Sequence, residues 1–119
     1  MRKKFKETLI KQCNLLICQI NLIRNGHKSE DEIISAISES CQKIYYTSEH
    51  ILEHYITIMP IELAEIISDI TSNDMLYELS TRSSGSLQNL TLEQIASNDR
   101  LYAQLILLQK KLSAEIENM

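Results

Sequence analysis

Residues 3–24 read KKFKETLIKQCNLLICQINLIR and set the pattern on which the rest of the chain is built. Apolar side chains recur in this segment at spacings of three and four, so they fall on one side of a helix. That first stripe consists of Phe5, Leu9, Cys13, Leu16, Ile20 and Ile23. Asn25-Gly26 follows, and glycine supplies the left-handed residue that commonly ends a helix. The sequence therefore predicts an amphipathic helix from about residue 3 to residue 24.

The same segment carries a second apolar stripe almost opposite the first, at Leu15, Cys18 and Leu22. A surface helix of a monomer needs only one apolar face. The second stripe is therefore expected to pack either inside the bundle or against another protein, a second copy of the chain included. We expect the partner protein, because a small bundle with short loops seldom encloses one of its own helices.

A second long helix is predicted from the segment that follows. Ser29-Glu30-Asp31-Glu32 has the form of a capping box, in which Ser29 and Glu32 satisfy free N–H groups at a helix start. Apolar residues then keep to one face as far as Met59. Thr47 and Ser48 are both good caps, and one of them falls within the apolar stripe. A break near these two residues is therefore the alternative to one continuous helix.

Pro60 begins a shorter helix, because proline fits a first helical turn and cannot continue a preceding helix. Residues 71–74 predict a turn, and residues 80–89 predict a flexible loop. A last helix is predicted from Thr91, which forms a capping box with Gln94. Its apolar seam has the spacing of a coiled coil, at Leu101, Leu105, Leu108 and Leu112.

Glycine occurs twice and proline once in 119 residues, which disfavours a fold of many strands and tight turns. We therefore predict one all-α domain over residues 1–119. Its architecture is an antiparallel helical bundle of three long helices plus one or two short ones. The basic N-terminal end, residues 1–6, is expected to fray.

The net charge of −4 is unevenly distributed: residues 1–11 carry +4 and the remainder carries −8. An acidic body repels phosphate, so no nucleic-acid partner is expected. Residues 90–97, LTLEQIAS, resemble the opening of a helix-turn-helix, yet Arg100 stands where the turn glycine is needed. No apolar run approaches the roughly 18 residues of a membrane span, so no membrane insertion is expected. Three cysteines without disulfide-framework spacing predict reduced thiols and a cytoplasmic protein.

His50, Glu53 and His54 spell H-x-x-E-H, the order of two metal ligands and a general base in one class of zinc peptidase. On a helical wheel all three point away from the apolar stripe, and such a site needs a third protein ligand and an enclosed cleft. We interpret them as a solvated helix face, with no metal and no cofactor. Two alternatives use the same histidines. One is a metal-responsive regulator, and the other is a histidine phosphotransfer-like signalling module, whose usual Lys-Gly step this chain lacks.

The sequence contains no recognisable nucleophile–base pair and no glycine-rich phosphate loop, so no enzyme is expected. The expected function is a small acidic protein-binding module, such as a chaperone, adaptor or inhibitor that packs apolar helical surface against a partner. That partner is another protein or a second copy of the chain. The expected interface residues are Leu15, Cys18, Leu22, Leu101, Leu105, Leu108 and Leu112.

Overall fold

The computed structural model describes residues 2–26, 30–81 and 92–117, and in these ranges the chain forms six helices and no strand. The long helices are α1 (Lys3–Arg24), α2 (Glu30–Tyr55) and α6 (Asp99–Glu117). The short helices are α3 (Ile61–Thr71), α4 (Asp74–Thr81) and α5 (Leu92–Ala96). The prediction of an all-α bundle with three long helices is confirmed, and three short helices accompany them in these ranges.

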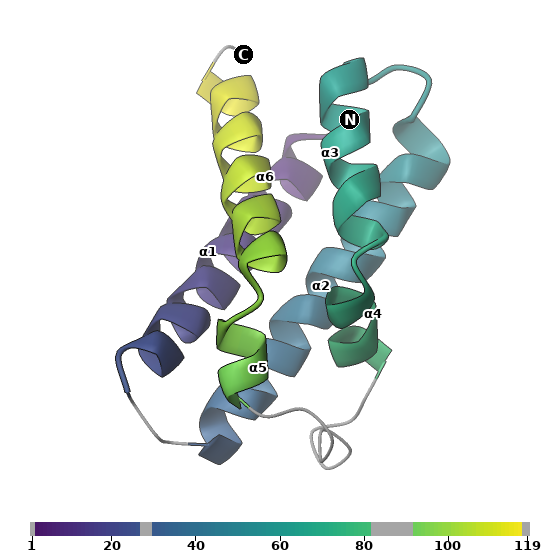
Figure 1. The fold of residues 1–119 in the computed structure, drawn as a ribbon. Helices are drawn as coiled ribbons and strands as arrows, with labels where there is room; N and C mark the ends of the chain where they lie inside the picture. Colours follow the sequence, from purple (N-terminus) through teal and green to yellow (C-terminus); the bar gives the residue numbers. More distant parts are fainter. Residues whose placement is uncertain (1, 27–29, 82–91, 118–119) are drawn as a thin grey trace.

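The helices alternate in direction along the bundle (Figure 1). α1 runs away from the end that holds both chain termini, α2 returns to it, α3 and α4 descend one after the other, and α5 leads into the rising α6. α1 packs against α2 and α6, α3 packs against α2 and α6, and α4 packs against α2. Because α3 and α4 follow one another along α2, the architecture is that of an antiparallel four-helix bundle.

The first apolar stripe of α1 supplies one wall of the core. Its middle residues are fully buried, as are the apolar faces of α2 and α6 that meet it. Burial of one such leucine or isoleucine side chain contributes about 1.5–3 kcal/mol relative to an exposed one. The fully buried apolar residues on these three helices are Leu9, Cys13, Leu16, Ile20, Ile37, Cys41, Ile44, Ile51, Leu101, Leu105, Leu108 and Leu112.

Most of the predicted helix ends are found where the local sequence places them. Gly26 has φ of +86° and its N–H donates to the Ile23 carbonyl at 3.0 Å, so it ends α1 as expected. Pro60 is the N-cap of α3. Asn73 caps α4, because its Oδ1 accepts hydrogen bonds from the N–H groups of Met75 and Leu76 at 3.0 and 3.1 Å.

The structure adds detail to two predicted segments, the N-terminal end and the loop at residues 80–89, and some of the predicted residues lie outside the described ranges. Residues 3–6, expected to fray, form the first turn of α1, and Ser80 and Thr81 of the predicted loop belong to α4. Ser29 and Thr91, the predicted caps of two helices, lie outside the described residues, as do residues 82–89 of the loop. The N-terminal turn is held by Phe5, whose ring centroid lies 5.9 Å from that of Tyr55 near the end of α2.

α2 is continuous through Thr47 and Ser48, so the alternative of a break at this point is wrong. Ile44, Ser48 and Ile51 follow one another at spacings of four and three, and all three side chains are buried. Burial of the two isoleucines outweighs the capping preference of the serine. The Ser48 hydroxyl is left without a hydrogen-bond partner in the described part of the chain.

The predicted last helix is divided at Ser97 and Asn98, and this is a correction to the sequence prediction. The Oδ1 atom of Asn98 accepts a hydrogen bond from the N–H of Leu101 at 2.9 Å, which caps α6 as a separate helix. The Asn98 N–H still donates to the Ile95 carbonyl at 3.3 Å, a contact that tightens the end of α5. A short-range side-chain cap thus replaces one turn of continuous helix.

Candidate protein-binding surfaces

The second stripe of α1 lies on the outside of the bundle. Leu15 is 43% exposed, Cys18 is exposed and Leu22 is half-buried, whereas Cys13 and Leu16 on the first stripe are fully buried. The sequence left two alternatives for this stripe, packing inside the bundle or packing against another protein. The exposure of Leu15 and Cys18 does not agree with the first alternative.

A shallow groove of about 270 Å³ runs between this outer face and α2. Leu15 and Lys11 line it from α1, and Glu39 and Lys43 line it from α2. The Nζ atom of Lys43 lies 3.0 Å from a carboxylate oxygen of Glu39, so these two charges neutralise each other along one wall. The groove therefore holds the exposed Leu15, the ion pair of Glu39 and Lys43, and Lys11, which forms no ion pair among the residues that the structure describes.

The four leucines of α6 lie elsewhere than expected. Leu101, Leu105, Leu108 and Leu112 are all fully buried, and they pack against the chain's own helices. The leucines do have the spacing of a coiled coil, but the helices that α6 packs against are α1 and α3 of the same chain. These leucines therefore present no surface to a second protein in this fold, which differs from the expectation that they pair with a partner helix.

The H-x-x-E-H residues are exposed on α2, as the helical wheel predicted. The rings of His50 and His54 lie 4.4 Å apart between centroids, and the ring of Phe5 lies 5.0 Å from that of His50. Glu53 is exposed between the two histidines in sequence. Among the residues that the structure describes, no three His, Cys, Asp or Glu side chains gather in a way that could hold a metal ion.

A surface that the sequence prediction missed lies at the turn from α2 to α3. Ile56, Ile58 and Ile61 are 54%, 70% and 75% exposed. Ile56 and Ile61 also line a concavity of about 590 Å³, together with Met59, Ala64, Glu65 and Ser68. Isolated exposed apolar residues are ordinary, but Ile56 and Ile61 line one concavity and Ile58 is exposed in the same turn, so apolar surface is concentrated here. The three isoleucines in ITIMPI, residues 56–61, are the feature of the sequence from which this surface could have been predicted.

Three tyrosines gather further along α2, beside α4. The Tyr45 ring lies 5.4 Å from that of Tyr77 and 5.6 Å from that of Tyr46, both in edge-on arrangements. The Tyr45 hydroxyl donates to a carboxylate oxygen of Glu49 at 2.7 Å, and this hydrogen bond is the main reason that the pKa of Tyr45 is raised to about 12. Exposed tyrosines of this kind are frequent in protein interfaces.

Charge is segregated on the same side of the molecule. Residues 44–81 contain seven carboxylates and neither lysine nor arginine. Glu62, one of these carboxylates, forms an ion pair at 2.9 Å with Nζ of Lys111 on α6. That hydrogen-bonded contact lowers the pKa of Glu62 and raises the pKa of Lys111. The second half of α2, α3 and α4 therefore form an acidic side of the bundle.

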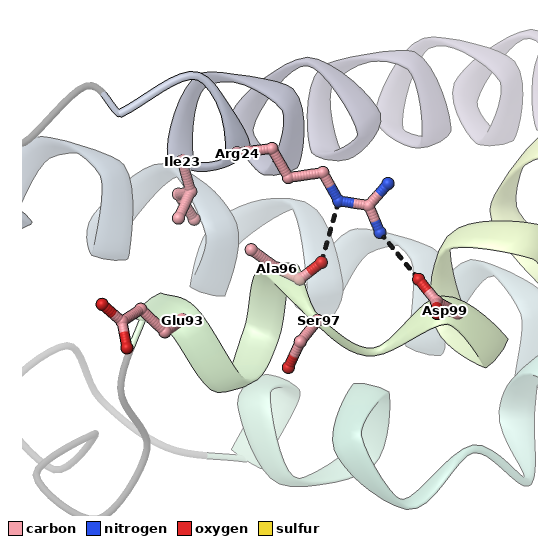
Figure 2. A pocket seen from close by; sticks show the side chains of 6 residues that line it. All are labelled: Ile23, Arg24, Glu93, Ala96, Ser97 and Asp99. Carbon is pink, nitrogen blue, oxygen red and sulfur yellow. Dashed lines mark hydrogen bonds and ion pairs between the residues drawn. The ribbon is translucent and has the colours of Figure 1, made fainter.

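Figure 2 shows a shallow pocket of about 380 Å³ where the end of α1 meets the α5–α6 junction. Arg24 extends across it and binds both the carbonyl oxygen of Ala96 and the carboxylate of Asp99, while Glu93 points away (Figure 2). The Ser97 hydroxyl donates to the Gln94 carbonyl at 3.2 Å. The polar groups that converge here are engaged in holding helices together, so we assign the pocket a structural role.

Comparison of the chain with protein-family models, with curated proteins and with solved structures gives no match. Within the described ranges, no helix has both the length and the apolar character needed to cross a bilayer.

Proposed function

We propose that this chain is a non-enzymatic, cytoplasmic protein-binding module of the chaperone, adaptor or inhibitor class, and that the outer face of α1 is a surface through which it pairs with a second copy. The observation that carries the proposal is the exposure of Leu15 and Cys18 on a helix whose other apolar stripe is already fully buried. Exposed apolar side chains in register along a helix gain free energy when a second surface covers them.

The stripe is suited to pairing with itself. Cys18 has Leu15 three residues before it and Leu22 four residues after it. In an antiparallel pair of α1 helices with the two-fold axis at Cys18, each Leu15 packs against Leu22 of the second copy. Lys11 lies beyond one end of the stripe, so the antiparallel arrangement places the two lysines at opposite ends. A parallel arrangement would place these two like charges side by side.

The stripe spans about 10 Å of helix, from seven residues at about 1.5 Å each. An interface centred on it belongs to the small class that forms weak or transient complexes. Self-association is therefore expected to depend on protein concentration, and sedimentation velocity over a concentration series is the appropriate measurement.

The primary test introduces charge on this face. Leu15→Glu with Leu22→Glu is expected to keep the helical circular dichroism spectrum and to abolish self-association, because the carboxylates are solvated in the monomer and buried without partners in the dimer. Since Leu22 is half-buried, Leu15→Glu alone is the second variant. Ile58→Glu, on a distant exposed residue, is the matched control. Unchanged association of a folded Leu15→Glu chain would contradict the proposal.

Cys18 offers a further test without any substitution. It is the one exposed cysteine among the three, and the proposed axis passes beside it. Mild oxidation is expected to give a disulfide-linked dimer in the wild type and none in Cys18→Ser. A wild-type chain that stays monomeric in sedimentation at every concentration, with no cross-link, would exclude a second copy as the occupant of this face.

A further inference from the structure

The acidic side of the bundle has carboxylates without counter-ions. Glu53, Glu65 and Asp69 are exposed and form no ion pair within the described ranges of the chain. Residues 44–81 supply no lysine or arginine that could neutralise them. This side therefore carries a local negative potential that exceeds what the net charge of the whole chain indicates.

An apolar and aromatic strip runs along the same side. Tyr45, Glu49 and Leu52 follow one another on α2 at spacings of four and three, which places them on one line of the helix, and Ile56 lies in the turn just after α2 ends at Tyr55. Tyr77 of α4 packs beside the first of them. The helical part of the strip, from Tyr45 to Leu52, is about 10 Å long, from seven residues at about 1.5 Å each.

Directly after α2 ends, Ile56 enters the concavity between the α2–α3 turn and α3. Ile56 and Met59 form one wall, and Ile61, Ala64 and Ser68 of α3 form the other. Glu65 is the charged residue of this lining, and Asp69 follows it one turn further along α3. α3 and α4 follow one another beside α2 (Figure 1), so the concavity at the start of α3 and Tyr77 of α4 lie on successive elements that pack against the same helix.

We propose that this acidic apolar groove, the concavity lined by Ile56 and Met59 of the α2–α3 turn and by Ile61, Ala64, Glu65 and Ser68 of α3, binds an amphipathic helix with lysine or arginine residues from a partner protein. Its apolar face covers Ile56 and Ile61, and its cations meet Glu65 and Asp69 of α3. The occupant is identified by charge complementarity, since neither lysine nor arginine lines the groove and Glu65 and Asp69 form no ion pair among the described residues.

The same charges disfavour other occupants. An anionic membrane and a nucleic acid both place negative charge against unpaired carboxylates. A second copy that docked through this groove in a two-fold dimer would oppose identical acidic surfaces. The proposal shares only its class, protein binding, with the proposed function. It uses a different surface, so either can fail while the other stands.

The probe is a synthetic amphipathic helix of about 18 leucine and lysine residues, five helical turns, labelled with fluorescein and titrated with the full chain in a fluorescence anisotropy assay. The expected result is saturable binding that weakens as salt is raised from about 0.05 to 0.5 M, since salt screens exposed charges. A peptide of the same pattern with glutamate in place of lysine is expected not to bind.

Paired variants locate the site. Ile56→Asn with Ile61→Asn is expected to weaken binding at least about tenfold, which follows from losing the burial of two exposed isoleucines. Glu65→Gln with Asp69→Asn is expected to weaken binding at low salt and to flatten its salt dependence. The matched controls, Leu107→Asn and Glu93→Gln, change an exposed leucine and an exposed glutamate on other helices and are expected to bind as the wild type does.

Four results would overturn the proposal. Equal binding to both pairs of variants and to the wild type would show a general attraction of cations to an acidic protein. Equal binding of the leucine–glutamate peptide, or no saturable binding below about 1 mM, would remove the charge argument. Co-sedimentation with vesicles of phosphatidylcholine and phosphatidylserine that the isoleucine variants abolish would assign the groove to a membrane surface instead.

Discussion

Arg24 at the end of α1 donates a hydrogen bond from Nε to the carbonyl oxygen of Ala96 at 2.8 Å, and so joins the first helix to the end of α5 (Figure 2). The last carbonyls of a helix have no partner within the helix, and a guanidinium group satisfies one here. The Cζ atom of Arg24 also lies 4.2 Å from the ring centroid of Tyr102 on α6. One side chain thus contacts both helices that flank the α5–α6 break.

Arg24→Ala is expected to lower the free energy of unfolding by about 1–2 kcal/mol, because it removes the bond to Ala96 and the contact with Tyr102. Asp99→Asn is expected to change it by less than about 0.5 kcal/mol, since the Asp99 carboxylate is almost wholly exposed. Urea denaturation of both variants measures the difference. Equal losses would show that the ion pair, rather than the bond to the carbonyl, is the stabilising contact.

Ser48→Ala is expected to raise the free energy of unfolding by about 1 kcal/mol. The Ser48 hydroxyl is buried in the middle of α2 without a hydrogen-bond partner among the described residues, and alanine is the better helix former. Ser38→Ala in the same helix is the matched control, because the Ser38 hydroxyl donates to the Leu79 carbonyl. Ser38→Ala is expected to be neutral or destabilising, and a Ser48 variant that behaves like it would contradict the assignment.

The sequence predicted the features that local signals determine. The periodicity of residues 3–24 gave the bounds of α1, Gly26 its end, and Pro60 the start of the next segment. These predictions succeed because the deciding contacts lie within one or two helical turns. The outward positions of Leu15, Cys18, His50 and His54 follow from the same periodicity once the buried face of each helix is known.

Features that depend on distant residues could not be read in the same way. The break between α5 and α6 is held in part by Arg24, which is 72 positions from Ala96 in the chain. The leucines of α6 have the spacing of an intermolecular seam, and only the packing of α1 and α3 shows that the seam is internal. The exposure of Ile58 and Ile61 likewise depends on which helices leave the α2–α3 turn uncovered.

Zinc is expected not to raise the melting temperature of the wild type. His50 and His54 lie together, but no third ligand joins them among the residues that the structure describes, and both side chains are exposed. The double variant His50→Ala with His54→Ala is expected to change the free energy of unfolding by no more than about 0.5 kcal/mol, as ordinary surface substitutions do. A zinc-dependent rise in melting temperature that the double variant abolishes would establish a metal site.

Thiol reagents are expected to distinguish the three cysteines. Cys18 is exposed and should react quickly with a disulfide reagent in the native protein. Cys13 and Cys41 are fully buried and should react only when the bundle opens. The measurement is a count of thiols modified before and after addition of denaturant, with Cys18→Ser as the control. Rapid native modification of two or three thiols would place Cys13 or Cys41 nearer the surface.

Alkaline pH is expected to destabilise the bundle through the two buried thiols. Burial raises the pKa of Cys13 from 9.0 to about 12, and burial raises the pKa of Cys41 as well, with a smaller contribution from the neighbouring Cys13. The folded state therefore keeps protons that the unfolded state loses, so the stabilisation is complete below pH 9 and decreases as the pH rises above it. At pH 10 the loss is about 1.4 kcal/mol for each thiol.

The pH window for this measurement is set by Tyr45. Its pKa, raised from 10.0 to about 12 by the hydrogen bond to Glu49, adds a loss of the same sign above pH 10. Urea denaturation between about pH 8 and pH 10 therefore isolates the thiols. Cys13→Ala with Cys41→Ala creates a less stable protein, because it leaves a cavity, but its stability should change little across this window. A variant that loses stability with pH as steeply as the wild type would assign the alkaline transition to other groups.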